Sequence, residues 1–301
     1  YFETHSHSRL RFSASLLLVA NMKVVTFAKV FVISLALVVG GTLEASPKRI
    51  VSMNGSMTEA LFAVGAGDSV VGVDTSSVFP AEAHRLPKIG YQSKLSAEGI
   101  LSLRPDLVVG TQDAGPPEVI EQIRRAGIRV EIYQDSSTVD GAFGKVLFAG
   151  KHSGHADKAA QIVERMRRNI KALKPLKGSP RVLFIYARGP GLVQVSGTNT
   201  QADAMLKLVG ATTALPEFEG FKPLTSEALV VANPDIILMP TRSLQSIGGI
   251  DGLLRIPGVA LTKAGKQRKV VAMDDMLLLG FSARLDEALI ELIRLLSAAA
   301  G

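Results

Sequence analysis

One pattern of residues occurs twice in this chain and points to a duplicated architecture. Residues 95–109 read LSAEGILSLRPDLVV, and residues 224–238 read LTSEALVVANPDIIL. Each copy starts with a hydroxyl side chain suited to capping a helix, followed by an acidic residue in the first turn. A Pro-Asp pair ends the short apolar helix, and the aliphatic run after it is typical of a buried parallel strand. The repeat predicts two lobes of similar build, with a ligand in the cleft between them.

A second, shorter echo supports the duplication. The strand-like residues 49–51 are followed by LFAVGA at 61–66, and the strand-like residues 181–184 are followed by LKLVGA at 206–211. In both places a glycine, Gly65 or Gly210, ends the helix, where a left-handed residue is least costly. Two unrelated strand–helix units would also look alike, but the longer repeat beside them makes chance the weaker explanation.

Between these repeats the chain alternates between strand-like and helix-like segments, which predicts an α/β fold of two Rossmann-like lobes with central sheets. The expected strands are 50–53, 70–74, 107–110, 130–133, 182–186, 193–195, 236–239 and 270–273, and the expected helices lie near 57–64, 96–103, 116–126 and 284–297.

A long helical stretch is expected in the middle of the chain. It runs over 139–149, is interrupted around Ser153 and Gly154, and continues over 157–173, where Ile162, Met166 and Ile170 recur at helical spacing. A helix between two lobes makes a stiff connection and predicts small closure movements. The predicted parts are an N-terminal lobe (46–150), a linking helix (151–178) and a C-terminal lobe (179–301).

Residues 1–45 have the character of an upstream segment followed by a targeting signal. Lys23 and Lys29 flank the start of an apolar core, residues 30–39, and residues 43–45 form a plausible cleavage site ending in alanine. The apolar core is too short for a comfortable membrane span. The interpretation is a cleaved signal peptide, with no structural role for residues 1–21; an uncleaved anchor is the alternative.

The amino-acid composition limits the cellular compartment and the kinds of partner that we expect for this protein. The chain has no cysteine, so an exported form has neither disulfides nor a thiol for a lipid anchor, and we expect a soluble periplasmic protein. It has no tryptophan and few aromatic residues, and its net charge of +7 is spread along the sequence. This pattern argues against nucleic-acid binding and favours a small anionic ligand.

Motifs of enzymes are mostly missing. The sequence has no phosphate-binding loop and no nucleophile elbow, and the lack of cysteine excludes thiol catalysis. After the signal segment only His84, His152 and His155 remain, of which the last two could hold a metal but are more often solvated. Asp274 and Asp275 are adjacent, and on a strand they would point to opposite faces, so they predict no acid/base pair.

Tyr91 is the candidate ligand-binding residue. It lies between Gly90 and polar residues, in the turn that leads into the first copy of the repeat, where a loop would line the cleft. A phenolate is a hard anionic donor that ligates ferric heme in some proteins. A cation such as Lys94 or Arg188 would help to hold the charged form. A surface or packing tyrosine is the competing interpretation.

Residues 90–105, with the pattern GYxxxLSAEGILSLxP, resemble the signature of the periplasmic heme-binding proteins of bacterial heme ABC importers. The resemblance continues through most of the chain, and its first and last blocks are specific to heme binders, whereas the strand–helix pattern is shared with cobalamin and siderophore binders. The further blocks are 200–205, 222–229, 256–265 and 274–281.

The resemblance implies that Tyr91 is the axial ligand of the heme iron. It also implies that Glu98 and Glu227 project from the two lobes toward arginines of the permease. Family members often carry arginine two residues after the tyrosine, where this chain has Ser93, followed by Lys94. Arg188 stands where some members have a histidine that helps to bind a second heme. A single heme, with Lys94 or Arg188 near the tyrosinate or a propionate, is the expected stoichiometry.

The sequence therefore predicts a protein, not an enzyme, that captures heme in the periplasm and delivers it to an inner-membrane ABC permease with its ATPase. An outer-membrane heme receptor is a possible upstream partner. The alternative in the same class is a siderophore or cobalamin binder, and the alternative from another class is a heme- or metal-dependent enzyme. An enzyme would need an open coordination position beside a general acid or base, for which the histidines are poorly placed.

Overall fold

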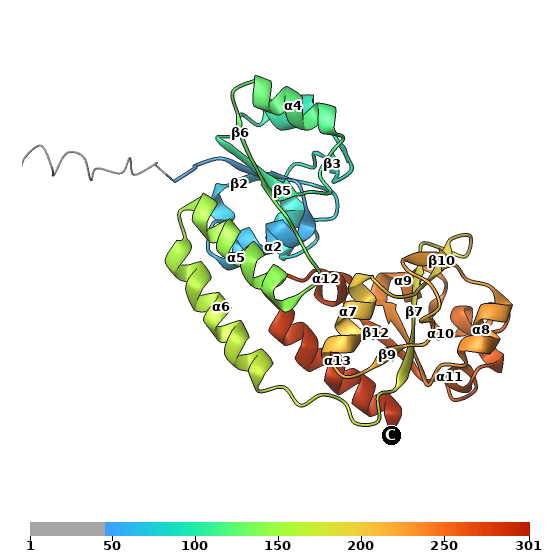
Figure 1. Ribbon diagram of the computed structural model, residues 1–301. Coiled ribbons are helices and arrows are strands. Elements are labelled where there is room, and N and C mark those ends of the chain that lie inside the picture. The colour runs from blue at the N-terminus through green and yellow to red at the C-terminus, as the bar shows by residue number, and fades with distance from the viewer. Residues whose placement is uncertain (1–45) are drawn as a thin grey trace, which may run out of the picture. The chain divides into compact units, whose positions relative to one another are not determined.

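The computed structural model describes residues 46–301. The predicted signal peptide and residues 1–21 lie outside the described residues. The described part forms two α/β lobes, one in blue and green and one mainly in yellow and orange (Figure 1). No helix within residues 46–301 has the length and apolar character needed to cross a membrane.

The N-terminal lobe is built on a fully parallel sheet of four strands in the order β2-β1-β5-β6. Its central strands are completely buried, as expected for the aliphatic runs that form them. The strands are β1 (Ile50–Ser52), β2 (Val70–Val73), β5 (Leu107–Thr111) and β6 (Arg129–Tyr133); the helices are α2 (Gly55–Ala63), α3 (Ala97–Ser102), α4 (Pro117–Arg125) and the 3₁₀ turns η1 (Gly67–Ser69) and η2 (Ala81–Arg85).

The C-terminal lobe has a six-stranded sheet. Its central strands are parallel, like those of the N-terminal lobe, and one edge is antiparallel. Strands β7 (Arg181–Ala187), β11 (Ile236–Pro240) and β12 (Val270–Met273) are parallel, and β9 (Thr212–Thr213) pairs with β7 in the same sense. Strands β8 (Val193–Ser196) and β10 (Phe221–Pro223) are antiparallel additions. The connection from β7 to β8 is too short for a crossover, so the chain must turn back as a hairpin.

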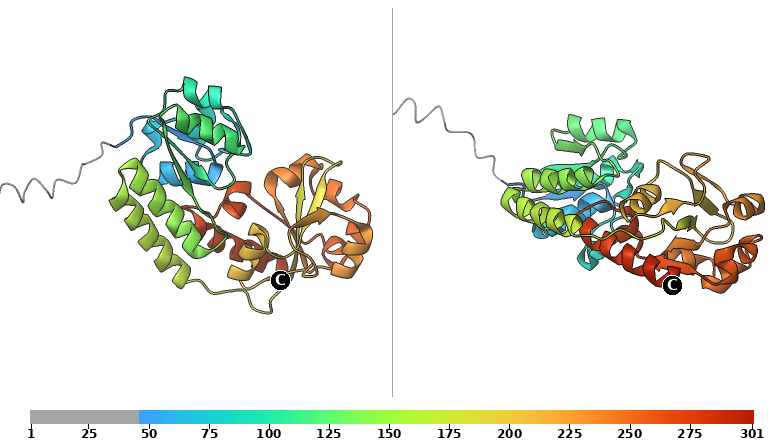
Figure 2. Two further views of the ribbon diagram at one scale, coloured as in Figure 1. Left: turned by 45° about the horizontal axis from the view of Figure 1, so that its top comes forward. Right: turned by 60° about the horizontal axis from the view of Figure 1, so that its bottom comes forward.

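Helices of the C-terminal lobe surround this sheet and lead into the final helix (Figures 1 and 2). They are α7 (Gln201–Leu208), α8 (Ser226–Ala232), α9 (Thr241–Ser246), α10 (Gly249–Leu254), η3 (Val259–Leu261), α11 (Lys263–Lys266), α12 (Asp275–Leu279) and α13 (Leu285–Ala300).

The two copies of the sequence repeat adopt the same local structure. The Ser96 hydroxyl accepts a hydrogen bond from the Gly99 amide in α3, and the Thr225 hydroxyl accepts one from the Ala228 amide in α8. These bonds satisfy amides that have no partner inside the helix, which confirms the predicted caps. The two glycines of the shorter echo, Gly65 and Gly210, have φ of 93° and 80°, also as predicted.

The Pro-Asp pair of each repeat anchors the neighbouring strand. The Asp106 carboxylate accepts hydrogen bonds from the amides of Lys48 and Arg49 at 2.9 and 3.0 Å, just before β1. The Asp235 carboxylate accepts one from the Arg181 amide at 3.0 Å, at the start of β7. Each aspartate amide also donates to the carbonyl of Arg49 or Arg181. The motif therefore joins the end of one strand–helix unit to the start of the sheet.

The central helical stretch is two helices, α5 (Val139–Ser153) and α6 (Ala156–Lys171), packed side by side (Figure 2). Gly154 ends α5 in the left-handed conformation with φ of 82°, which turns the chain into α6. From α6 a non-helical segment, 172–180, leads to β7. The interruption predicted at Ser153 and Gly154 is confirmed.

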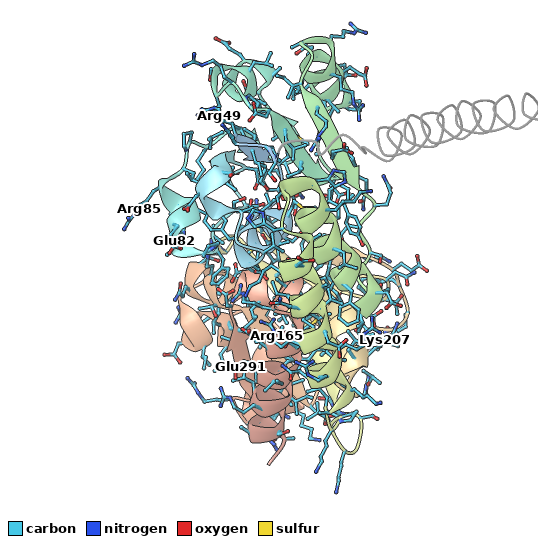
Figure 3. The ribbon with its side chains drawn as sticks, turned by 90° about the vertical axis from the view of Figure 1, so that its left-hand side faces the viewer. Arg49, Glu82, Arg85, Arg165, Lys207 and Glu291 are labelled. Carbon is cyan, nitrogen blue, oxygen red and sulfur yellow. The ribbon has the colours of Figure 1, made fainter. Side chains whose placement is uncertain are left out.

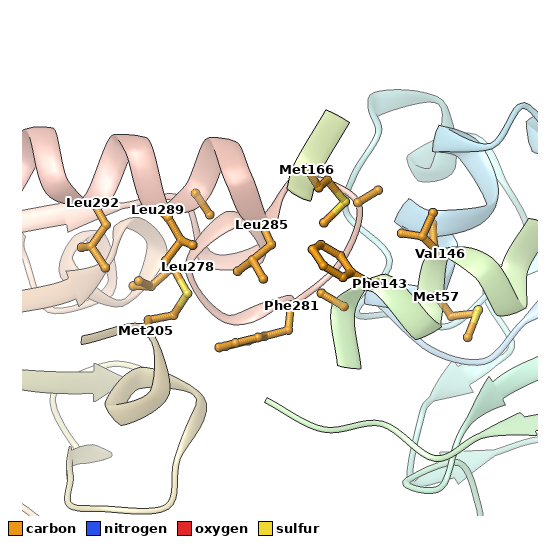
Figure 4. Close-up of a cluster of buried hydrophobic side chains, with 14 of the residues drawn as sticks. Met57, Phe143, Val146, Met166, Met205, Leu278, Phe281, Leu285, Leu289 and Leu292 are labelled. Atoms are coloured by element: carbon orange, nitrogen blue, oxygen red, sulfur yellow. The ribbon is translucent and has the colours of Figure 1, made fainter. Parts of the chain in front are cut away.

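One hydrophobic cluster continues from the N-terminal lobe into the C-terminal lobe. Met57 of α2 and Phe143 and Val146 of α5 belong to the same buried cluster as Phe281 and Leu285, and side chains from α6, α7, α12 and α13 extend it (Figure 4). Moving one lobe relative to the other would expose this apolar surface to water, which is unfavourable. The continuous cluster supports the expectation of small closure movements.

Buried polar contacts cross the same junction. Lys145 of α5 is fully buried, and its ammonium group contacts the Asp135 carboxylate at 2.7 Å, the Ser56 hydroxyl at 2.9 Å, and the carbonyls of Gly280 and Phe281 at 3.1 and 2.9 Å. These partners come from three separate segments of the chain. A buried ammonium is tolerated only when it is paired and hydrogen-bonded, as here.

Two arginines reinforce the junction around residues 280–286. Arg284 forms a 2.7 Å ion pair with the buried Glu59 of α2. Arg165 of α6 donates to the Ala283 carbonyl at 2.7 Å and lies next to α13 (Figure 3). Burial raises the pKa of Glu59, and Arg284 opposes this effect. The segment before α13 is therefore held by α2, α5 and α6 at once.

Candidate functional site

A cavity of about 690 Å³ lies between the two lobes, at the carboxyl ends of their strands. Its N-terminal wall carries Tyr91, several hydroxyl side chains and the carboxylates of Asp113 and Asp135. Its C-terminal wall carries two arginines, Arg188 and Arg242. Apolar lining is concentrated in residues 276–281, and most of the other lining residues are polar or charged.

Tyr91 projects from a tight hairpin formed by β3 (Gly90–Tyr91) and β4 (Lys94–Leu95). Gly90 has φ of 104°, and a Cβ atom there would lie 2.5 Å from the Lys94 carbonyl oxygen. Only glycine fits this turn without strain. The side chain of Tyr91 is 42% exposed and lines the cavity, so its hydroxyl is accessible to a ligand.

The hairpin is fixed to the rest of the lobe by contacts that the sequence interpretation missed. Gln92 makes a side-chain hydrogen bond with Asn54, and its carbonyl accepts from the Gly115 amide at 2.8 Å. Asn54 in turn caps α2 through the amides of Ser56 and Met57. The only sequence signal for these residues is that Gln92 adjoins Tyr91, because the other partners are distant in the chain.

Arg188 lies opposite Tyr91 on the C-terminal wall. Its Nε atom donates to the Tyr186 hydroxyl at 2.7 Å. The hydrogen bond with the Tyr186 hydroxyl raises the pKa of Arg188 above its already high ordinary value. The structure thus brings together Tyr91 and Arg188, as predicted, and adds Tyr186, a second phenol that the sequence interpretation did not select.

The other predicted site residues lie away from this cluster. Lys94 is exposed and is the cross-strand partner of Tyr91, and the residues that line the cavity do not include it. Glu98 and Glu227 are exposed in the first turns of α3 and α8, and neither lines the cavity. Their equivalent placement in the two lobes matches the repeat.

Arg242 and Asp275 are further cavity residues that the sequence interpretation missed. The Arg242 amide donates to the Asp275 carboxylate at 3.2 Å, and burial raises the pKa of Asp275. Asp274 caps α12 by accepting from the Leu277 amide. The adjacent aspartates therefore open α12, directly after β12, which ends at Met273 as the predicted strand 270–273 does.

Among residues 46–301, the three histidines are not grouped as metal ligands. His152 lies 3.6 Å from the Glu131 carboxylate, and the His155 ring lies 2.9 Å from the Ser153 carbonyl. His84 is exposed in η2. Within residues 46–301 no group of three or more histidine, cysteine or acidic side chains is arranged to hold a metal ion.

The sequence pattern of the periplasmic binding proteins matches residues 50–277. An uncharacterized ABC transporter substrate-binding lipoprotein of Bacillus subtilis (strain 168), YvrC, is 30% identical over 204 residues. That match covers 65% of this chain and 65% of YvrC, so it spans just under two-thirds of the length of that relative.

Two solved structures share both the fold and much of the sequence. The periplasmic heme-binding protein RhuT from Roseiflexus sp. RS-1, in apo form, is 42% identical with a TM-score of 0.79, over 84% of this chain and 99% of that one. The periplasmic heme-binding protein BhuT in complex with two hemes is 38% identical with a TM-score of 0.78, over the same shares. The chain belongs to the periplasmic binding protein family, whose members are substrate-binding components of ABC transporters.

Proposed function

We propose that this protein captures heme in the periplasm and delivers it to an inner-membrane ABC importer. The observation that carries the proposal is the accessible phenol of Tyr91, held by a rigid hairpin in the cavity between the lobes. The likeness to RhuT and BhuT over nearly the whole length of both supports heme as the ligand.

Tyr91 has the chemistry of an axial ligand to ferric heme. A phenolate is a hard anionic oxygen donor, which suits Fe(III). Arg188, a cation, lines the same cavity from the C-terminal lobe. The cavity volume of about 690 Å³ falls in the usual range for a single ligand of this class. One heme per protein is the stoichiometry that we favour.

Hemin titration with Tyr91→Ala tests the assignment. The wild-type protein should give a phenolate-type, high-spin visible spectrum that saturates at one hemin per chain. Tyr91→Ala should lose that spectrum and on the order of a hundredfold in affinity, equivalent to about 2.7 kcal/mol. The control is Tyr186→Phe, which removes the hydroxyl of the other tyrosine in the cavity and should keep the spectrum.

An unchanged Soret band and unchanged affinity in Tyr91→Ala would remove Tyr91 as the ligand and leave Met276, another cavity residue, as the next candidate. Cobalamin and ferric siderophores, titrated in the same way, distinguish the alternative ligand classes of the fold. Saturable binding of cobalamin with no hemin binding would replace heme as the assigned ligand.

Delivery requires contact with the permease, and we assign this role to Glu98 and Glu227. Both carboxylates are exposed, both lie in the first turn of an equivalent helix, and they come from different lobes. A transporter with two-fold symmetry offers one matching basic contact to each lobe. We also propose that the signal peptide is cleaved and that the mature protein carries no lipid anchor. An outer-membrane heme receptor would act upstream of it.

The double variant Glu98→Ala/Glu227→Ala separates docking from binding. It should bind hemin normally and lose only about 0.3–1 kcal/mol of helix stabilisation per site. Heme transport into vesicles that contain the importer should fall, and the wild-type contact should weaken as salt is raised. Normal transport by the double variant would leave both glutamates with a capping role alone.

A further inference from the structure

Arg242 is the second arginine that lines the cavity. It lies in the first turn of α9, and its side chain is 54% exposed. The C-terminal wall holds it close to the Arg188 loop, because the Ser246 hydroxyl of α9 accepts a hydrogen bond from the Gly189 amide at 2.9 Å. Two cations therefore share one wall of the cavity.

The guanidinium of Arg242 has hydrogen-bonding capacity to spare. Its Nε atom lies 3.9 Å from the Asp275 carboxylate, beyond the 2.7–2.9 Å of a charge-assisted hydrogen bond. Asp275 itself is anchored by the Arg242 amide at 3.2 Å. Among residues 46–301 the structure gives this guanidinium no closer acidic partner. Asp275 thus orients Arg242 without occupying its donors.

The opposite wall has the opposite charge. Asp113 and Asp135 line the cavity from the N-terminal lobe, and only Asp135 is matched by a buried cation, Lys145, at 2.7 Å. An anionic group on a ligand is repelled from that wall and attracted to Arg188 and Arg242. The attraction is stronger in a partly closed cavity than in water, because the effective dielectric constant is lower.

Arg188 and Arg242 differ in how far they are already engaged. Arg188 is hydrogen-bonded to the Tyr186 hydroxyl at 2.7 Å, so one of its donors is already occupied. We propose that Arg242, oriented by Asp275, receives a carboxylate of the bound ligand, so that heme is held with a propionate against α9 of the C-terminal lobe. This inference rests on the proposed function and assigns the orientation of the ligand within it.

The test compares hemin with hemin dimethyl ester, in which both carboxylates are masked while the iron and the macrocycle are unchanged. The wild-type protein should bind hemin roughly tenfold or more tighter than the ester, the range expected for a hydrogen bond between charged groups. Arg242→Gln should weaken hemin binding by a similar factor and leave binding of the ester unchanged.

Arg255→Gln is the matched control, since Arg255 is an exposed arginine of the same lobe that does not line the cavity. It should leave both affinities unchanged. Equal weakening of hemin and ester by Arg242→Gln would show a purely structural effect and overturn the inference, as would no change in either. Failure of the wild-type protein to bind hemin would overturn the proposed function as well. Normal hemin binding by the wild-type protein, with the same ratio of hemin to ester affinity in Arg242→Gln, would overturn this inference alone.

Discussion

The two lobes share a scaffold and differ in the residues that face the ligand. Both contain the capped helix, the left-handed residue before proline, and the aspartate that anchors the first strand. The N-terminal lobe has the short β3–β4 hairpin directly before its repeat, which presents Tyr91, whereas the C-terminal lobe lines the cavity with Tyr186 and two arginines. The repeated residues therefore build the frame, and the ligand chemistry lies where the copies differ.

A substitution at the junction between the lobes tests whether the lobes unfold as two units or as one. Lys145→Met leaves the Gly280 and Phe281 carbonyls without a donor and Asp135 without its cation, which should cost about 3–5 kcal/mol of unfolding free energy. Chemical denaturation should show one cooperative transition at lower denaturant concentration. Lys151→Met, on the exposed end of the same helix, is the control and should change little.

Two separate transitions in the Lys145→Met variant would show that the lobes depend on this side chain to unfold together. If Lys145→Met lowers the unfolding free energy by less than about 1 kcal/mol, the typical effect of an ordinary substitution, then Lys145 does not hold the junction together.

Substitution of one glycine in each lobe compares the two segments that precede the copies of the repeat. Gly90 and Gly220 both have positive φ, but a Cβ atom at Gly90 would lie 2.5 Å from a backbone oxygen, whereas nothing lies within 4 Å of one at Gly220. Gly220→Ala should cost about 1–2 kcal/mol from the left-handed conformation alone. Gly90→Ala should cost more and should also weaken hemin binding, because the hairpin that carries Tyr91 must shift.

Denaturation and hemin titration of both variants measure these effects. Equal stability losses with unchanged hemin affinity in Gly90→Ala would mean that the hairpin geometry does not position Tyr91.

The smallest expected effect concerns the anchor aspartate of the second repeat. Hydrogen bonding to Lys263 lowers the pKa of Asp235 below its ordinary value. Because the folded-state pKa lies below the unfolded one, the stabilisation is present above the unfolded pKa, about 3.9, and is lost as the pH falls through the folded pKa. The pair is partly exposed, so its contribution is at most about 1 kcal/mol.

Lys263→Met should therefore lower stability slightly at pH 7 and reduce the further loss between about pH 5 and pH 3. Denaturation midpoints across this range, with Lys266→Met as a neighbouring control, measure the difference. An unchanged pH profile in Lys263→Met would show that the backbone contact with Arg181, and not the lysine, holds the Asp235 carboxylate.

Local patterns determined the elements of the fold before any tertiary contact was known. The positions of the longer strands, the caps at Ser96 and Thr225, and the break at Gly154 follow from residues close together in the sequence. The two-lobed arrangement followed from the repeat, because copies of one strand–helix unit build similar lobes. Tyr91 was singled out through its setting in a turn, whereas Arg188 was named as a candidate cation and through the family resemblance.

Only the tertiary structure decided which distant side chains share one environment. From the sequence alone, the side chain of Lys145 in α5 could have faced solvent. It is buried because three separate segments supply its ionic and hydrogen-bonding partners. Arg242 and Asp275 reach the cavity because α9 and α12 follow adjacent parallel strands, whose ends meet at one edge of the sheet. The antiparallel edge of the C-terminal sheet likewise depends on pairing with β8. Such contacts join residues with no pattern in common, so no local periodicity could reveal them.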